Sequence, residues 1–149
     1  MGAYDQAIYD VVKHLRPYSI LGWHCTRLTD SEIEKMLTSG IQMPDAVTLH
    51  RRIDECVSAK QLPLDIATML KAKNQAHDAY RAGIFWFCFF PPKLAGEAGI
   101  SRFFRHWGGE ALYNYHEDDP ITSKALSAFG TPCIVEADVP IVYMGSDSI

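Results

Sequence analysis

The chain has 149 residues, of which 48% are hydrophobic and 21% charged, and its formal net charge is −4. This length suits one domain with a sizeable core, and the composition excludes a disordered chain. The negative charge removes any uniform attraction to a phosphate backbone or to anionic lipid. Binding of nucleic acid would therefore need a local basic patch, such as Arg51-Arg52 or Arg102 with Arg105.

The spacing of the cysteines and the character of the N-terminal residues indicate the cellular compartment in which the protein is expected. No two of the four cysteines have the C-x-x-C spacing of a zinc ribbon. Residues 1–10 lack the basic and then apolar pattern of a signal peptide, and the longest apolar stretch, residues 84–92, is too short to span a membrane. We therefore expect a cytoplasmic protein, without a membrane segment, whose cysteines are buried and reduced.

Apolar periodicity predicts helices in the first half of the chain. Residues 3–15 read as an amphipathic helix, and residues 19–24 read as a short buried strand. Thr29 and Glu32 form a capping box at the start of the next helix, which Gly40 ends. Two further helices, over residues 44–59 and 64–81, are expected to form a hairpin inserted between strands.

The second half of the chain alternates strands and short helices. The aromatic run over residues 84–90, closed by Pro91-Pro92, predicts a strand covered on both faces. We further expect a helix over residues 99–106 and a sharp turn at 107–110, followed by a segment over 111–115 that the sequence does not assign to helix or strand. A helix capped by Asp119-Pro120 should end near Ala128. A strand is expected over residues 132–139, and residues 141–144 could continue it.

These elements predict an α+β fold in a single domain over residues 1–149. A small central sheet, mixed or antiparallel, would be built from the segments near Ile20, Phe87 and Val135 and flanked by helices, with the helical hairpin on one side. Trp23, Trp86 and Trp107 are expected to lie in its core.

The stretch Trp23-His24-Cys25-Thr26-Arg27 is the best candidate for chemistry. An isolated histidine at a strand end is often a core residue satisfied by a backbone carbonyl. Here, however, three features follow one another: Gly22-Trp23-His24-Cys25-Thr26, the apolar helix positions 33–37 and Gly40-Ile41. Together, over about residues 21–41, they resemble the opening segment of the ADP-ribosyltransferase superfamily. Members with a His-type motif begin with a strand that ends in H-x-T.

This resemblance implies that NAD is the substrate and that ADP-ribose is transferred to a protein or nucleic-acid acceptor, or that NAD is cleaved. It implies that His24 hydrogen-bonds the nicotinamide ribose, that the backbone of Cys25 holds the carboxamide and that Thr26 braces the histidine. Cys25 stands where glycine is commoner in the family. The oligomeric state, the acceptor and the biological role, such as toxin or defence protein, stay open.

A glutamate is the family's other key group, and two positions compete for it. Glu110 follows Gly108-Gly109, which could let a ligand approach the backbone; Glu136 lies in the late strand from which the family usually takes this residue. We favour Glu110. For the ring that stacks on nicotinamide, Tyr113 and Tyr80 are candidates, with Trp86 or Phe87 as substitutes.

Other chemistries fit the sequence less well. Cys25 cannot use His24 as its base, because adjacent strand residues point to opposite faces, so a different histidine, such as His106, would have to act. A metal site from His24, His106 and His116 lacks a diagnostic spacing, and no metal is expected. Gly108-Gly109 lacks the lysine of a phosphate loop. A non-catalytic role as inhibitor, immunity protein or adaptor remains the alternative to an enzyme.

Overall fold

A computed structural model describes residues 2–144 of the chain, in which it contains seven α-helices and two β-strands. In chain order these are α1 (Ala3–Leu15), β1 (Ser19–Leu28), α2 (Asp30–Ser39), α3 (Ala46–Ser58), α4 (Leu64–Ala72), α5 (Gly96–Arg105), α6 (Glu110–His116), α7 (Pro120–Ser127) and β2 (Thr131–Pro140). Short 3-10 helices lie at Pro92–Ala95 and Ile141–Tyr143.

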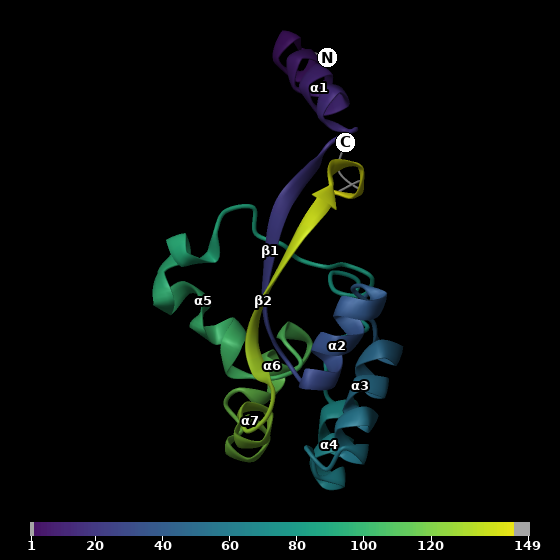
Figure 1. Ribbon diagram of the computed structural model, residues 1–149, viewed down its shortest axis with the longest axis vertical. Helices are drawn as coiled ribbons and strands as arrows, with labels where there is room; N and C mark the ends of the chain where they lie inside the picture. The colour runs from purple at the N-terminus through teal and green to yellow at the C-terminus, as the bar shows by residue number, and fades with distance from the viewer. Residues whose placement is uncertain (1, 145–149) are drawn as a thin grey trace.

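The two strands form a long antiparallel ribbon around which the other elements are arranged. Ser19 lies opposite Pro140 at one end of the ribbon, and Leu28 lies opposite Thr131 at the other. Figure 1 shows α5 on one side of this twisted ribbon and α2, α3 and α4 on the other, with α6 and α7 near its lower end. The predicted α+β fold, with a small antiparallel sheet flanked by helices, is thus confirmed.

The hydrophobic core lies at the helical end of the molecule. Trp107, Ile53, Leu70, Leu112 and Leu126 have no or almost no exposed surface and belong to one cluster. They come from α3, α4, α6, α7 and the turn before α6, so the predicted helical hairpin α3–α4 supplies one wall of this core.

Local signals for the helix ends are confirmed where they are strongest. The Thr29 hydroxyl accepts from the Glu32 amide at 3.3 Å, and the Glu32 carboxylate accepts from the Thr29 amide at 2.8 Å, which is the predicted capping box. Asp119 accepts from the amides of Ile121 and Thr122 at the start of α7. α1 has the predicted bounds.

Two predicted helix and strand extensions are wrong. The helix expected to reach residue 81 ends at Ala72, because Asn74 donates its side-chain amide to the carbonyls of Leu70 and Lys71 and accepts from Ala76 N. The carbonyls of Leu70 and Lys71 thus accept from a side chain, where another turn of helix would supply backbone amides, and α4 ends here. Residues 141–143 form a 3-10 helix and do not continue β2; residue 144 follows it.

The aromatic run over residues 84–90 is extended, but the prediction that it is a strand covered on both faces is wrong. It pairs with β1 only at one bridge, where Trp23 and Cys88 exchange two backbone hydrogen bonds of 2.9 Å. Trp86 is 60% exposed, so its expected place in the core is also wrong. Trp23 is half-buried, and only Trp107 of the three tryptophans is a core residue.

The four cysteines are free in the structure. Only Cys56 is buried, however, while Cys25, Cys88 and Cys133 are half-buried, so the expectation of burial is correct for one of the four. Burial raises the pKa of the Cys56 thiol to about 12.

Candidate functional site

His24 lies in the middle of β1, on the face that is increasingly buried toward the helical end. Gly22, Thr26 and Leu28, which share this face by strand alternation, are all buried, and His24 itself is half-buried. The ring therefore stands at the border between the core and the exposed part of the ribbon.

A single hydrogen bond fixes the tautomer of His24. Its Nδ1 lies 2.8 Å from the carbonyl oxygen of Trp86. A carbonyl only accepts, so Nδ1 carries the proton and Nε2 of the neutral ring keeps a free lone pair. Among the described residues, no group is hydrogen-bonded to Nε2.

The charge state of this ring follows from its surroundings. Burial lowers the pKa of His24 below its ordinary value. The bond to Trp86 opposes this effect, the charge of Arg52 adds to the lowering, and the charge of Glu110 raises the pKa. Since the net shift is downward, His24 is neutral at pH 7.

Aromatic rings hold the imidazole in place. The Phe85 ring lies with its centre 4.3 Å from that of His24, and the Phe87 ring lies 6.2 Å away. A Cβ added to Gly22 would stand only 3.1 Å from the Cβ of Phe87, so a glycine at this position allows the aromatic run to approach β1 closely.

The backbone of Cys25 faces the free edge of β1. Trp23 exchanges both of its backbone hydrogen bonds with Cys88, on the side of β1 that points away from β2. Backbone groups of residues two apart in a strand point to the same side, so the N–H and C=O of Cys25 point to this edge as well. In the described part of the chain, no backbone partner from the aromatic run pairs with them.

Trp107 anchors the Gly-Gly turn that leads to Glu110. Its indole Nε1 donates to Glu32 at 2.8 Å, and its backbone amide donates to Leu126 O at 3.0 Å. Glu32 also accepts from Arg52 Nε at 2.6 Å, and Arg52 lies 4.8 Å over the Trp107 ring. Burial alone would raise the pKa of Glu32, but Arg52 and the hydrogen bonds outweigh it, so that the pKa is lowered and the carboxylate is charged.

Glu110 is the first residue of α6 and is held by two side chains. Arg81 forms an ion pair with Oε2, and the Tyr113 hydroxyl donates to Oε1 at 3.0 Å. Burial and the charge of Glu110 raise the pKa of Tyr113 to about 12, so Tyr113 stays a donor. A carboxylate has about four lone-pair sites, so Glu110 retains acceptor capacity for a ligand hydroxyl.

The charge of Glu110 raises the pKa of His24 but is the smallest of the four effects on it, and among residues 2–144 no hydrogen bond or ring contact joins the two side chains. Glu136 lies on another face. Glu136 lies opposite Trp23 in the ribbon and accepts from Trp23 Nε1 at 2.8 Å, whereas His24 lies opposite Val135. Directly paired residues share a face, so Glu136 lies on the face opposite to His24.

The remaining candidates, Thr26 and the rings proposed to stack on nicotinamide, differ in how far their side chains are exposed. Thr26 is buried two residues after His24 on the same face of β1. Tyr113 is also buried and has Arg102 4.4 Å over its ring, so it is a partner of Glu110 rather than a free stacking ring. Tyr80 is almost fully exposed. Phe85 is the ring that contacts His24.

Arg27, in the same stretch of β1, connects this strand to neighbouring helices. Its guanidinium donates to three backbone carbonyls, those of Phe129 at 2.7 Å, Phe104 at 3.0 Å and Ser127 at 3.2 Å. A cation at the last carbonyls of helices complements the helix dipoles. Arg27 thereby ties β1 to the ends of α5 and α7.

The alternative chemistries have no assembled site among residues 2–144. Burial raises the pKa of the Cys25 thiol, so it is not an activated nucleophile. His116 is buried and satisfied by Thr122 and the Lys73 carbonyl, and His106 is buried against Ser123. In this part of the chain, no three metal-binding side chains come together.

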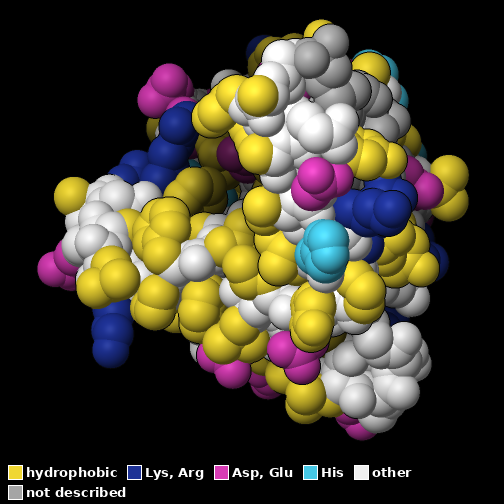
Figure 2. Space-filling model, turned by 90° about the horizontal axis from the view of Figure 1, so that it is seen from above, with side chains coloured by type: hydrophobic (Ala, Val, Ile, Leu, Met, Phe, Trp, Pro, Cys, Tyr) yellow, Lys and Arg dark blue, Asp and Glu magenta, His cyan; other side chains and the backbone are white. Residues whose placement is uncertain are grey.

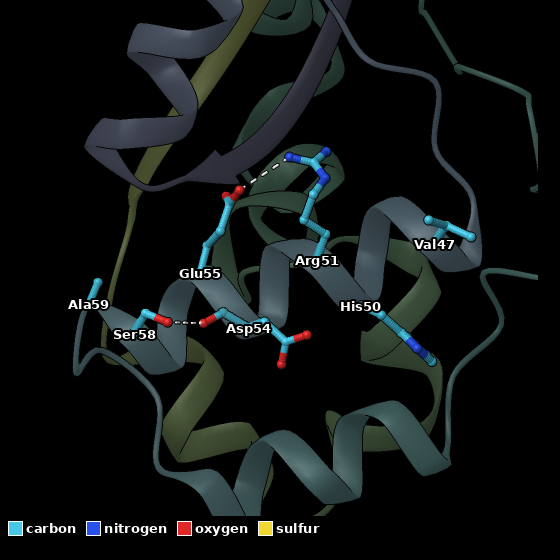
Figure 3. A pocket seen from close by; sticks show the side chains of 7 residues that line it. All are labelled: Val47, His50, Arg51, Asp54, Glu55, Ser58 and Ala59. Carbon is cyan, nitrogen blue, oxygen red and sulfur yellow. Dashed lines mark hydrogen bonds and ion pairs between the residues drawn. The ribbon is translucent and has the colours of Figure 1, made fainter.

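Surface hollows do not coincide with the candidate residues. Figure 3 shows one along α3, where Arg51 and Glu55 pair at 3.2 Å and Ser58 donates to the Asp54 carbonyl at 2.9 Å. A second hollow lies on α5. His24, Glu110 and Tyr113 line neither hollow.

Comparison with known proteins gives no relative of this chain. No family model, curated protein or solved structure matches it. A search of the described helices found none with the length and apolar character needed to cross a membrane.

Sequence reasoning missed Arg81, Phe85 and Glu32 as parts of this neighbourhood. Arg81 lies in a segment that the sequence predicts to be helical, and its pairing with Glu110 spans 29 residues. Glu32 was identified only as a capping residue, although the same carboxylate also binds Arg52 and Trp107. The strand alternation over residues 84–90 was the one signal that could have selected Phe85 and Phe87.

Proposed function

We propose that the chain binds NAD at the free edge of β1 and transfers ADP-ribose to a macromolecular acceptor or cleaves NAD. The observation that carries this proposal is that, in the described residues 2–144, neither the backbone N–H and C=O of Cys25 nor Nε2 of the neutral His24 ring has a hydrogen-bond partner. A carboxamide presents one carbonyl acceptor and one N–H donor, which a strand's N–H and C=O match without any charge.

His24 orients the nicotinamide ribose in this proposal. Its Nε2 lone pair accepts from a ribose hydroxyl, and the Trp86 carbonyl keeps the ring from rotating or changing tautomer. Thr26 packs below it on the same face, and the Phe85 ring offers an aromatic surface beside the imidazole.

Glu110 stabilises the positive charge that develops on the ribose as nicotinamide leaves. A carboxylate next to an oxocarbenium-like centre lowers the barrier by electrostatic attraction, as in glycoside hydrolysis. Arg81 and Tyr113 keep this carboxylate in place and retain room for a ligand hydroxyl on its oxygens. Glu136, bound to Trp23 on the other face, has no part in this step.

The test measures release of nicotinamide from NAD, together with thermal unfolding with and without NAD. His24→Ala and Glu110→Gln should each lower turnover by about a hundredfold or more, because each removes a contact to the reacting ribose. Glu136→Gln is the matched control and should keep wild-type turnover. NAD at a hundred times its dissociation constant should stabilise the wild-type fold by about 2.7 kcal/mol.

Full turnover in both His24→Ala and Glu110→Gln would refute this function, as would the absence of any effect of NAD on unfolding. The second candidate is a non-catalytic interaction module. It is favoured by the large apolar side chains exposed on α1 and at the adjoining end of the ribbon, including Tyr4, Val11, Tyr18 and Tyr143.

A further inference from the structure

Among residues 2–144, no element packs on α1 closely enough to bury its apolar side chains. No residue of this helix is buried, and Figure 1 shows it beyond the upper end of the ribbon, away from the other helices. A helix of 13 residues is marginal in water without tertiary packing. The stability of α1 therefore requires a surface that covers it.

Four of the exposed apolar residues of α1 form one narrow stripe, and Tyr9, which is 50% exposed, lies outside it. Tyr4, Ile8, Val11 and Leu15 follow one another at intervals of four, three and four residues, and they are between 44% and 77% exposed. This spacing is that of the seam between two packed helices. Seen from the end at which α1 lies, hydrophobic side chains cover much of the molecular surface (Figure 2).

The charges beside this stripe match a second copy of the same helix. Asp5 and Arg16 are eleven residues apart, which is about three helical turns, so they lie on the same flank of the stripe at opposite ends. In an antiparallel pair related by a two-fold axis, the same flanks of the two helices face each other, and each contact occurs twice. Asp5 of each helix then faces Arg16 of the other.

We propose that the chain forms a two-fold symmetric dimer through antiparallel packing of α1 against α1 of a second copy. The stripe supplies the apolar seam, the Asp5–Arg16 pairs set the antiparallel direction, and the helix dipoles oppose each other favourably. The exposed apolar residues at the neighbouring end of the ribbon, Tyr18, Ile20, Val142 and Tyr143, extend this surface. The dimer is independent of any reaction with NAD.

The first experiment is sedimentation equilibrium of the full chain at several protein concentrations. The wild type should show a monomer–dimer equilibrium, and Val11→Asp should be monomeric throughout, because it places a charge in the seam. Gln6→Asp is the matched control on the opposite side of α1, with the same charge change, and should dimerise like the wild type. A monomeric wild type, or a Val11→Asp chain that still dimerises, would overturn the proposal.

The second experiment tests the direction of packing. Asp5→Arg and Arg16→Asp should each weaken self-association about tenfold or more, because both ion pairs become repulsive. An equimolar mixture of the two variants should associate more strongly than either alone, since one chain then carries arginine and the other aspartate at both positions, and opposite charges face each other again. A mixture that associates no better than its components would rule out this geometry, even if a helical contact exists.

Discussion

The two ends of the β1–β2 ribbon differ in what surrounds them. At the helical end, Leu28 and Thr26 are buried, α5 packs against β1, and the hydrophobic core that contains Trp107 lies nearby. At the other end, Ile20 and Leu21 are exposed, and α1 beyond them has no buried residue. Free energy of folding comes mainly from buried apolar surface, so the helical end should carry the stability of the chain.

The candidate site lies between these two ends. His24 stands where β1 passes from the exposed part of the ribbon to the buried part, and Glu110 begins a helix of the core. Strand and helix position the two side chains, and among residues 2–144 the backbone groups of Cys25 on the edge of β1 away from β2 have no backbone partner. Such a border is where ligands reach fixed polar groups without an unfolding step.

The largest expected effect comes from the centre of the helical end. Trp107→Ala should lower the free energy of unfolding by about 3–5 kcal/mol, because it leaves a large cavity and removes the donor to Glu32. Trp86→Ala, at a 60% exposed position, should cost less than about 1 kcal/mol. Urea denaturation of both variants measures this difference, and equal losses would contradict a core centred on Trp107.

An intermediate effect is expected where the ribbon is tied to the helical end. Arg27→Lys keeps the charge but cannot reach three carbonyls with a planar fork, so unfolding should become easier by about 1.5–3 kcal/mol. Arg16→Lys, at the exposed residue that follows α1, is the matched control and should change the thermal stability of the core by little. If both variants have the wild-type unfolding midpoint, the Arg27 contacts do not join the two regions.

The smallest effect concerns pH. Burial lowers the pKa of both His24 and His106, so the unfolded chain binds protons more readily than the folded one. Their contribution to stability is therefore complete above the unfolded value of about 6.5 and is lost as the pH falls through and below it. His24→Asn should make the loss of unfolding free energy between pH 7 and pH 5 smaller.

Urea titrations at the two pH values measure this change. His77→Asn, which replaces a largely exposed imidazole in the same way, is the control variant. A His24→Asn chain with the full wild-type pH dependence would show that this ring is as accessible to protons in the folded state as in the unfolded one.

The sequence by itself determined the local elements and the helix ends. The bounds of α1, the capping box of Thr29 and Glu32 and the Asp119 cap all follow from interactions within a few residues, which the order of side chains specifies. The α+β class and the candidate His24 with Glu110 were also proposed from sequence. Strand alternation further separates Cys25 from His24, because it is a property of any strand.

Only the tertiary structure decided which segments lie side by side. The run over residues 84–90 is extended as its composition predicts, but whether its amides pair with β1 depends on how near the two segments come, and they meet at one bridge. In the same way Arg81 reaches Glu110, Glu32 reaches Trp107, and Glu136 lies away from His24. These contacts join residues far apart in the chain, so no local pattern encodes them.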